Sequence, residues 1–238
     1  MNPSSILPDA ALSFIEKAAS PLRRQVLEVL RQSIIAGRLQ PGSRLVEREL
    51  ISMMGVSRTV IREALRQLES EGLVAVIANK GPIVRELTLA EARDLYSIRA
   101  VLEGLAARLF TENAKDEEVQ SLEHELDAVA QAYEGGERDL ILESKNRFYE
   151  ILFEGARSES LSSMIGLLHV RIWRWRALGL GHPRRSDQRW KASVERLREL
   201  VRAIKKRDAT IAEAILREEV TEAAAEVARL LESPKAVS

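Results

Sequence analysis

Apolar side chains recur at helical spacing in the first third of the chain and predict three short helices. The first helix follows Pro21, a residue that suits the first helical position, and it stops at Gly37. The second covers 45–54. The third begins after Ser57, whose hydroxyl can cap it, and it ends at Gly72.

After the third helix the hydrophobic pattern changes from helix to strand. Residues 73–77 form a continuous apolar run, 79–82 supply turn residues, and 83–85 have the composition of a returning strand. Three helices followed by a hairpin make a winged helix-turn-helix. We expect Lys80 and Gly81 at the tip of the wing, where a glycine lets the backbone approach DNA closely.

From Thr88 onward the apolar patterns are helical, and no strand is predicted. Thr88 and Glu91 form a capping box, which we take as a domain boundary. The expected helices cover 88–113, 115–134, 137–155, 158–179, 186–206 and 208–232. The predicted fold class is therefore mostly α: an N-terminal arm at 1–20, a winged helix-turn-helix domain at 21–87, and an all-α bundle of about six helices at 88–233.

Charge is distributed unevenly along the chain, although its formal net charge is zero. Between residues 21 and 86, eleven Arg or Lys stand against seven Glu, so this region carries +4 and the remainder −4. A basic module joined to an acidic one fits a DNA-facing domain attached to a domain that stays off DNA. There is no cysteine, and neither a membrane span nor a signal peptide is predicted, so we expect a cytoplasmic protein.

The third helix carries a series of arginines with the spacing of one helix face. Arg58, Arg62 and Arg66 follow each other at intervals of four residues. A short helix, a glycine turn and a helix that begins with arginine form the helix-turn-helix pattern, in which the second helix reads base edges in the major groove. An arginine fork can pair with guanine or with phosphate, although exposed arginines can also merely solvate a helix.

Residues 30–87 closely resemble the DNA-binding domain of the GntR superfamily of bacterial transcription regulators. The resemblance rests on 34–45, on Glu-Arg-Glu-Leu at 47–50, and on the stretch from Gly55 to Val74. It implies that the residues in contact with double-stranded DNA are Arg48, Ser57, Arg58, Thr59, Arg62 and Gly81, with Lys80 beside Gly81 in the wing.

The resemblance extends to the helical part and to the assembly of the protein. Residues 95–107 and 203–209 resemble the effector domain of the FadR subgroup of that superfamily. This implies a homodimer on a palindromic operator, with two recognition helices that read half-sites about one helical turn apart. Val60 stands where many relatives have proline or threonine, so the DNA contact at that position is left open.

Many members of the subgroup bind a divalent metal through one aspartate and three histidines, and this chain departs from that pattern. The matching positions hold Lys145, Tyr149, Leu197 and Glu219. None of the three histidines of the chain occurs there. A lysine would repel a cation, so we predict no metal and no other cofactor.

We expect the helical domain to bind a small anionic effector instead, an organic acid or an acyl compound. An arginine directed at a helical core needs an internal acid or a bound anion as its partner, and Arg99 and Arg171 both occur among apolar positions. An internal pair with Glu103, and another acid for Arg171, would explain them without a ligand. The candidate effector-binding residues are Arg99, Asn146, Tyr149, His169 and Arg171.

These patterns predict a DNA-binding transcription regulator, specifically a repressor whose operator binding is modulated by the effector. One alternative is a dimeric regulator without an effector, in which the bundle serves only for dimerisation. A polar-lined cavity would argue against it. A second alternative is an enzyme with a fused winged helix, but no nucleophile triad, phosphate loop or metal-ligand cluster supports it, so we expect no enzyme.

Overall fold

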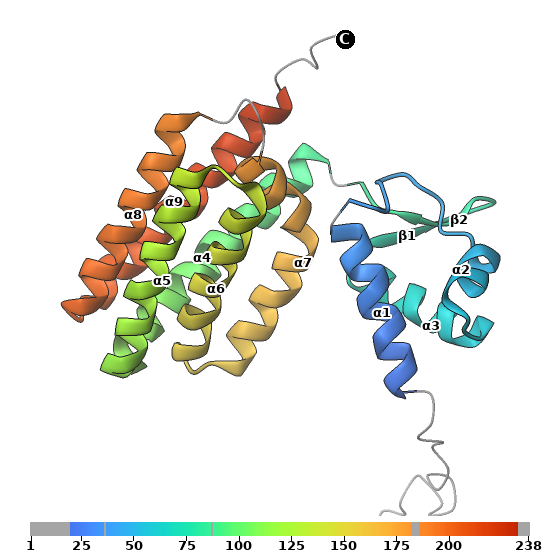
Figure 1. The fold of residues 1–238 in the computed structure, drawn as a ribbon, viewed down its shortest axis with the longest axis horizontal. Helices are drawn as coiled ribbons and strands as arrows, with labels where there is room; N and C mark the ends of the chain where they lie inside the picture. Colours follow the sequence, from blue (N-terminus) through green and yellow to red (C-terminus); the bar gives the residue numbers. More distant parts are fainter. Residues whose placement is uncertain (1–19, 36, 87, 182–185, 233–238) are drawn as a thin grey trace, which may run out of the picture. The chain divides into compact units, whose positions relative to one another are not determined.

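The computed structural model describes residues 20–35, 37–86, 88–181 and 186–232 of the chain. It divides into two compact units, Met1–Arg85 and Glu86–Ser238 (Figure 1). The N-terminal arm that was predicted at 1–20 lies, apart from Ser20, outside the described residues.

The first unit is a small helical domain with a two-stranded wing. Its elements are α1 (Ser20–Ile35), α2 (Glu47–Met54), α3 (Arg58–Ser70), β1 (Val74–Ile77) and β2 (Gly81–Val84). The apolar stripe of α3 packs against α1 because Ile61 and Leu68 turn away from solvent, where they meet Leu30 in a common core. These elements follow the predicted order, and the predicted fold class is confirmed.

The turn between α2 and α3 uses the local signals that the sequence predicts. Gly55 ends α2 with φ 65, a left-handed conformation that glycine adopts without steric cost. The hydroxyl of Ser57 then accepts a hydrogen bond from the backbone N–H of Val60 at 3.4 Å, which caps α3. The cap determines where the first turn of α3 starts, and with it which side chains that turn presents.

The wing differs from its predicted extent at one end. β1 and β2 pair antiparallel, with Ile77 opposite Gly81, so β2 begins at Gly81 and includes Pro82 instead of starting at Ile83. A bridge between Arg44 and Ile83 adds the segment before α2 to the other edge of β2. The hairpin itself was predicted, but the bridge between Arg44 and Ile83 has no periodic signal in the sequence, because it joins residues that are distant along the chain.

The second unit is built from helices that match the predicted bundle. Along its described ranges these are α4 (Leu89–Asn113), α5 (Asp116–Gly135), α6 (Arg138–Gly155), α7 (Glu159–Gly181), α8 (Asp187–Lys205) and α9 (Ala209–Glu232). The predicted capping box starts α4: Thr88 Oγ1 accepts from the Glu91 N–H at 3.2 Å, and the Glu91 carboxylate accepts from the Thr88 N–H at 2.9 Å. None of the helices in these ranges is long and apolar enough to cross a membrane.

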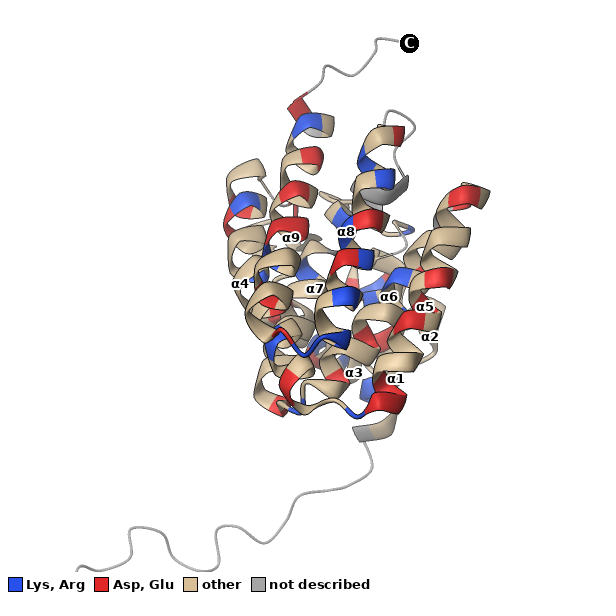
Figure 2. Ribbon diagram, turned by 90° about the vertical axis from the view of Figure 1, so that its left-hand side faces the viewer, with Lys and Arg blue, Asp and Glu red and all other residues tan. Residues whose placement is uncertain are grey.

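Packing within the second unit brings α4 and α9 together along much of their length (Figure 1). A Cβ added at Gly155 of α6 would clash with the ring of Phe110 on α4, so the glycine permits a close approach of these two helices. Figure 2 shows acidic residues spaced along α9 and basic residues along α8, and Arg196 pairs with Glu222 across them at 2.9 Å. The two side chains are 25 % and 35 % exposed, so water screens the pair and its contribution is small; the apolar core provides most of the stability.

A second, smaller apolar cluster of the bundle lies beside the main core. Its buried members are Leu95, Tyr96, Ala100, Ile172, Val220 and Val227, from α4, α7 and α9. Between this cluster and the main core the helices carry buried polar and charged side chains, including Arg99, Lys145 and Glu219. Buried charges need partners, so this region is the candidate site of the second unit.

Candidate functional site

Five of the residues predicted to contact DNA lie on α2, on α3 or at the cap of α3. Arg58 and Thr59 occupy the first turn of α3, Arg62 follows one turn later, and Arg48 lies on α2; all four are exposed. Arg62 Nε lies 3.8 Å from a carboxylate oxygen of Glu47, and both side chains are exposed. An exposed pair of this kind is weak, so Arg62 can exchange it for a phosphate at small cost.

The remaining positions of the first unit differ in their exposure. Val60 is only 7 % exposed and packs in the core of the unit, so its side chain does not face solvent, which is the point that the sequence left open. Lys80 is exposed in the turn of the wing. Gly81 has φ 78, a conformation that other residues adopt only with strain.

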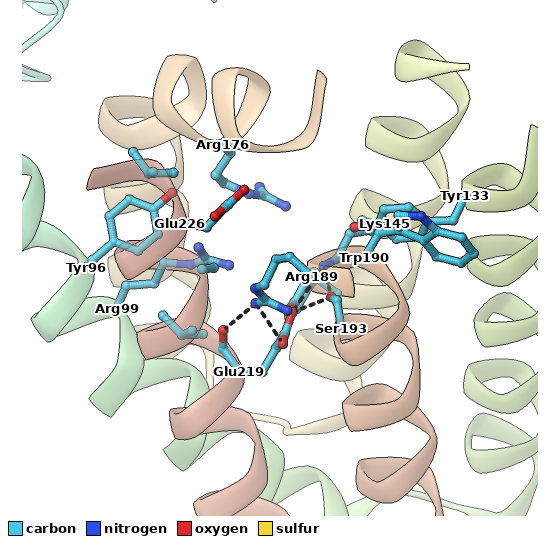
Figure 3. A pocket seen from close by; sticks show the side chains of 14 residues that line it. Tyr96, Arg99, Tyr133, Lys145, Arg176, Arg189, Trp190, Ser193, Glu219 and Glu226 are labelled. Atoms are coloured by element: carbon cyan, nitrogen blue, oxygen red, sulfur yellow. Dashed lines mark hydrogen bonds and ion pairs between the residues drawn. The ribbon is translucent and has the colours of Figure 1, made fainter. Parts of the chain in front are cut away.

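The second unit contains a cavity whose walls come from all six of its described helices (Figure 3). Its volume of about 50 Å³ has room for a few water molecules or a small carboxylate. The residues that line it are Tyr96, Arg99, Tyr133, Lys145, Tyr149, Arg176, Arg189, Trp190, Ser193, Glu219, Val220, Ala223, Glu226 and Val227.

The structure brings together only part of the predicted effector site. Arg99 and Tyr149 line the cavity, while Asn146, His169 and Arg171 do not. Arg171 precedes Arg176 by five residues and is therefore turned by roughly 140° around α7. Asn146 is turned away for the same reason, because it follows a lining residue of α6 by one position. The predicted ligand contacts of Asn146 and Arg171 are not supported by this cavity.

A buried ion pair lies directly behind one wall of the cavity. Arg99 donates from Nε to Glu103 Oε1 at 2.6 Å and from Nη2 to Oε2 at 3.2 Å. His169 Nε2 lies 2.6 Å from the same Oε1. Burial raises the pKa of the Glu103 carboxyl, but Arg99 and His169 outweigh burial and hold that pKa at about 2. The internal Arg99–Glu103 pair, which the sequence left as an alternative to a ligand, is therefore present.

His169 connects this pair to a second guanidinium. Because Glu103 is ionised and only accepts, the proton of the neutral imidazole lies on Nε2, and Nδ1 is left as an acceptor 3.5 Å from Arg176 Nη1. Burial and the positive charge of Arg176 lower the pKa of His169 to about 4. His169 thus orients Arg176, although it does not itself reach the cavity.

We expect these groups to make the stability of the protein depend on pH. The pKa of His169 is lower in the folded chain than its usual value of 6.5, so its contribution is present at pH 7 and is lost as the pH falls from 6.5 towards 4. His169→Gln, which can keep both hydrogen bonds, should reduce that loss by about 2–3 kcal/mol in urea unfolding measured at pH 7 and pH 4. His124→Gln, at an exposed position of α5, is the control, and an equal reduction in both variants would contradict the assignment.

A second buried network occupies the opposite wall. Lys145 Nζ donates to Ser193 Oγ at 3.2 Å and to Glu219 Oε1 at 3.4 Å, and the Ser193 hydroxyl donates to the same carboxylate oxygen at 2.5 Å. Arg189 Nη2 donates to the other oxygen, Oε2, at 3.0 Å, as the dashed lines in Figure 3 show. The carboxylate of Glu219 therefore accepts hydrogen bonds from two cations, Lys145 and Arg189.

The cavity wall holds more positive than negative side chains. The cations are Arg99, Lys145, Arg176 and Arg189, and the acids are Glu219 and Glu226. Glu103 and Glu222, which lie outside the lining, pair with Arg99 and Arg189, so the excess of positive charge belongs to the lining itself. Burial and the neighbouring Arg99 lower the pKa of Arg176, as expected where cations outnumber acids. This arrangement favours the binding of an anion.

The positions that the resemblance assigns to metal ligands do not fit a divalent cation. Lys145, Tyr149 and Glu219 line the cavity, whereas Leu197 is fully buried in the core and Ser193, one turn earlier, faces the cavity instead. Glu219 is the one acid among these residues, and it already accepts from two cations. Within the described ranges no group of three or more His, Asp or Glu could hold a metal ion.

Several lining residues were not predicted as effector ligands. They include Arg176, Arg189, Trp190 and Ser193. One signal was available for Arg176, because it follows His169 by seven residues and so shares a face of α7 with it. The sequence had marked Lys145 only as a residue that would repel a metal.

Both parts of the chain match models of known families. Residues 22–84 match the model described as bacterial regulatory proteins of the gntR family, and residues 94–222, more than half of the chain, match the model of the FCD domain. The gntR match covers the first unit, which carries the exposed arginines, and the FCD match covers the second unit, which contains the cavity.

Individual relatives agree with these matches. The HTH-type transcriptional regulator YdhC of Bacillus subtilis is 33 % identical over 147 residues, which are 61 % of this chain and 66 % of that protein. A probable D-xylose utilization operon transcriptional repressor of Paenarthrobacter nicotinovorans is 29 % identical over 156 residues, 66 % of this chain and 64 % of that protein. The chain thus spans just under two thirds of the length of these two curated relatives.

One solved structure is similar to this chain over a larger share of both proteins than the two sequence relatives are. McbR of Escherichia coli, an HTH-type transcriptional regulator, superposes with a TM-score of 0.73 at 26 % identity and covers 89 % of this chain and 99 % of its own. These relatives carry the names of transcriptional regulators, which agrees with the prediction of a regulator and not of an enzyme.

Proposed function

Since the chain belongs to the GntR family of bacterial regulatory proteins and carries an FCD domain, we propose that it is a transcription regulator whose DNA binding responds to a small anionic effector. The observation that supports an effector is the cavity between the helices, whose lining holds more cations than acids. We further propose that the protein acts in the cytoplasm as a repressor, a role that the name of one relative also states.

The first unit would bind the operator through α3 and the wing. The exposed first turn of α3 enters the major groove, where Arg58 reads a base edge and Ser57, Thr59 and Arg62 contact bases or phosphates. Arg48 contacts the backbone from α2. The wing, with Lys80 and Gly81, approaches the neighbouring minor groove, and the conformation of its glycine supports a close approach.

Arg58→Ala tests this reading of the recognition helix. Loss of a base contact should weaken binding to an operator found by in vitro selection by about 1–3 kcal/mol, and weaken binding to random DNA less, in anisotropy titrations. Arg66→Ala is a matched control, because Arg66 is an exposed arginine of the same helix two turns further on. An equal loss on both DNAs would make Arg58 a phosphate contact.

A homodimer would place two such units on a palindromic operator. On α4 the side chains of Ile98, Val101 and Leu105 are 44 %, 50 % and 38 % exposed, and their spacing of three and four residues places them on one face. An exposed apolar stripe of this kind marks an interaction surface, and a second copy can cover it symmetrically.

The effector would act by preferring one arrangement of the helical domains in this dimer. Binding to that arrangement shifts the population of dimers and with it the spacing of the two winged helices. A repressor would then leave its operator when the effector is present. A regulator without an effector is the second candidate, but buried charges around a cavity do not support a bundle that serves only for dimerisation.

A further inference from the structure

We infer that the ammonium group of Lys145 is a built-in cation that binds the anionic group of the effector directly, so that the cavity takes its ligand without a metal ion. The inference rests on the proposed effector function of the cavity and adds to it the group that anchors the ligand. It begins from the residues that stand where the resemblance places metal ligands, since these do not suit a metal.

Lys145 is held in position by two hydrogen bonds, and the third N–H of its ammonium group is not used by them. The side chain is almost fully buried, at 6 % exposure of the residue, and it lines the cavity. Ser193 and Glu219 accept two of its hydrogen bonds, and an ammonium has three donors. The third N–H is therefore available to an oxygen atom of a ligand.

Arg189 provides a second donor at the same wall. Its Nη2 is used by Glu219, but its Nη1 is buried and has no hydrogen-bond partner among the described residues. Glu222 Oε2 lies 3.7 Å from Nη1 and makes an ion pair with it, without a hydrogen bond. A buried donor that lacks a partner costs free energy, and an anion in the cavity would remove that cost.

The local charge balance fits one carboxylate. Among the residues that line the cavity, Lys145 and Arg189 share one acid, Glu219, so this part of the lining has one more positive than negative group. The other ion-pair partner of Arg189, Glu222, does not line the cavity. Lys145 Nζ donates to the Glu219 carboxylate at 3.4 Å, and this contact with a negative charge favours the protonated ammonium. A ligand with one negative charge would neutralise the wall.

The same contacts disfavour a divalent cation. A metal ion bound to Glu219 would share that carboxylate with the ammonium of Lys145, which lies 3.4 Å from Oε1, and like charges repel strongly in a buried site. The other neighbours cannot compensate, because Ser193 is neutral and burial raises the pKa of Tyr149 to about 12. This part of the cavity wall therefore favours an anion over a divalent cation.

The remaining lining residues indicate which non-ionic part of a ligand the cavity can hold. Tyr133 and Trp190 stack with ring centroids 5.8 Å apart, and Lys145 lies beside this stack in Figure 3. Val220 and Val227 of α9 add apolar surface. A monocarboxylate with a compact apolar group matches both sides of the site.

The test uses the full chain after treatment with EDTA, with acetate, propionate and benzoate as probes in calorimetric titrations. At least one probe should bind with a dissociation constant that EDTA does not change. Lys145→Gln should weaken that binding at least about tenfold, while Lys145→Arg should retain most of it because it keeps the charge. Lys205→Gln, at a half-exposed lysine of α8 that pairs with Glu123, is the control and should bind as the parent does.

The possible outcomes separate the inference from the proposed function. Unchanged affinity in Lys145→Gln, or binding that EDTA abolishes and Zn²⁺ or Mn²⁺ restores, overturns the inference and leaves an effector site. Failure of the parent to bind any of the three acids overturns both. Should Lys145→Gln fail to fold, Arg189→Gln replaces it, and the same tenfold loss is expected because Arg189 supplies the other donor.

Discussion

Glu103→Gln is expected to lower the free energy of unfolding by about 3–5 kcal/mol, because it leaves the buried guanidinium of Arg99 without its counter-charge. Glu103 is fully buried, and Arg99 is 4 % exposed, so water cannot replace the lost partner. The variant also replaces one of the two carboxylate oxygens that accept from Arg99 with an N–H donor. Urea unfolding of the parent and the variant at pH 7 measures the difference.

The same helix offers a matched control for this change. Arg108 and Glu112 form an arginine–glutamate pair with the same four-residue spacing, but their side chains are 49 % and 43 % exposed. Glu112→Gln should therefore cost no more than about 0.5 kcal/mol. A second check is the double variant Arg99→Met/Glu103→Gln, which should recover part of the loss because no unpaired charge remains buried. Equal, small effects of both single variants would show that the buried pair is not needed for stability.

Val101→Glu is expected to convert the protein into a monomer and to weaken operator binding roughly 100-fold. The reason is that a carboxylate in the centre of the exposed stripe of α4 would meet its own copy across a symmetric interface, and that a monomer loses the second half-site. Light scattering coupled to size-exclusion chromatography gives the mass, and anisotropy titration gives the affinity.

Leu140→Glu separates this effect from a general effect of surface charge. Leu140 is 50 % exposed on α6, as Val101 is on α4, so the two substitutions introduce the same charge at equal exposure. The control should remain dimeric and bind the operator normally. A dimeric Val101→Glu protein would exclude the α4 stripe as the interface, and circular dichroism would verify that both variants are folded.

The sequence predicted most of the fold, because its signals are local. Ser57 and the Thr88–Glu91 box cap the helices they were expected to cap, and glycine ends α2 where the pattern stops. The family resemblance is also confirmed over both parts of the chain. What the pattern could not show is the pairing of Arg44 with Ile83, since nothing in either segment specifies the other.

The residues that line the cavity were only partly predictable, because the sequence pattern does not fix how each helix is rotated about its axis. α7 is apolar over much of its surface, so the periodicity does not say which of its arginines turns towards the neighbouring helices. Arg171 and Arg176 look alike in the sequence, yet only Arg176 reaches the cavity. Likewise, the resemblance matched Leu197 of α8 to a metal-ligand position, while packing buries Leu197 in the core and places Ser193 at the wall one turn earlier. The orientation of each helix about its own axis is set by the whole bundle.

Each of the helices α4 to α9 contributes residues to the cavity wall. Ligand preference therefore cannot be transferred to another protein with a single helix. Grafting a single helix from a relative would exchange one wall and leave five unmatched, so such chimeras should lose the parent's ligand without acquiring the donor's. A change of ligand would instead require coordinated substitutions scattered from residue 96 to residue 227. The proposed DNA-contacting residues of the winged helix, by contrast, lie within residues 48–81, so we expect that operator preference could be transferred independently of the ligand.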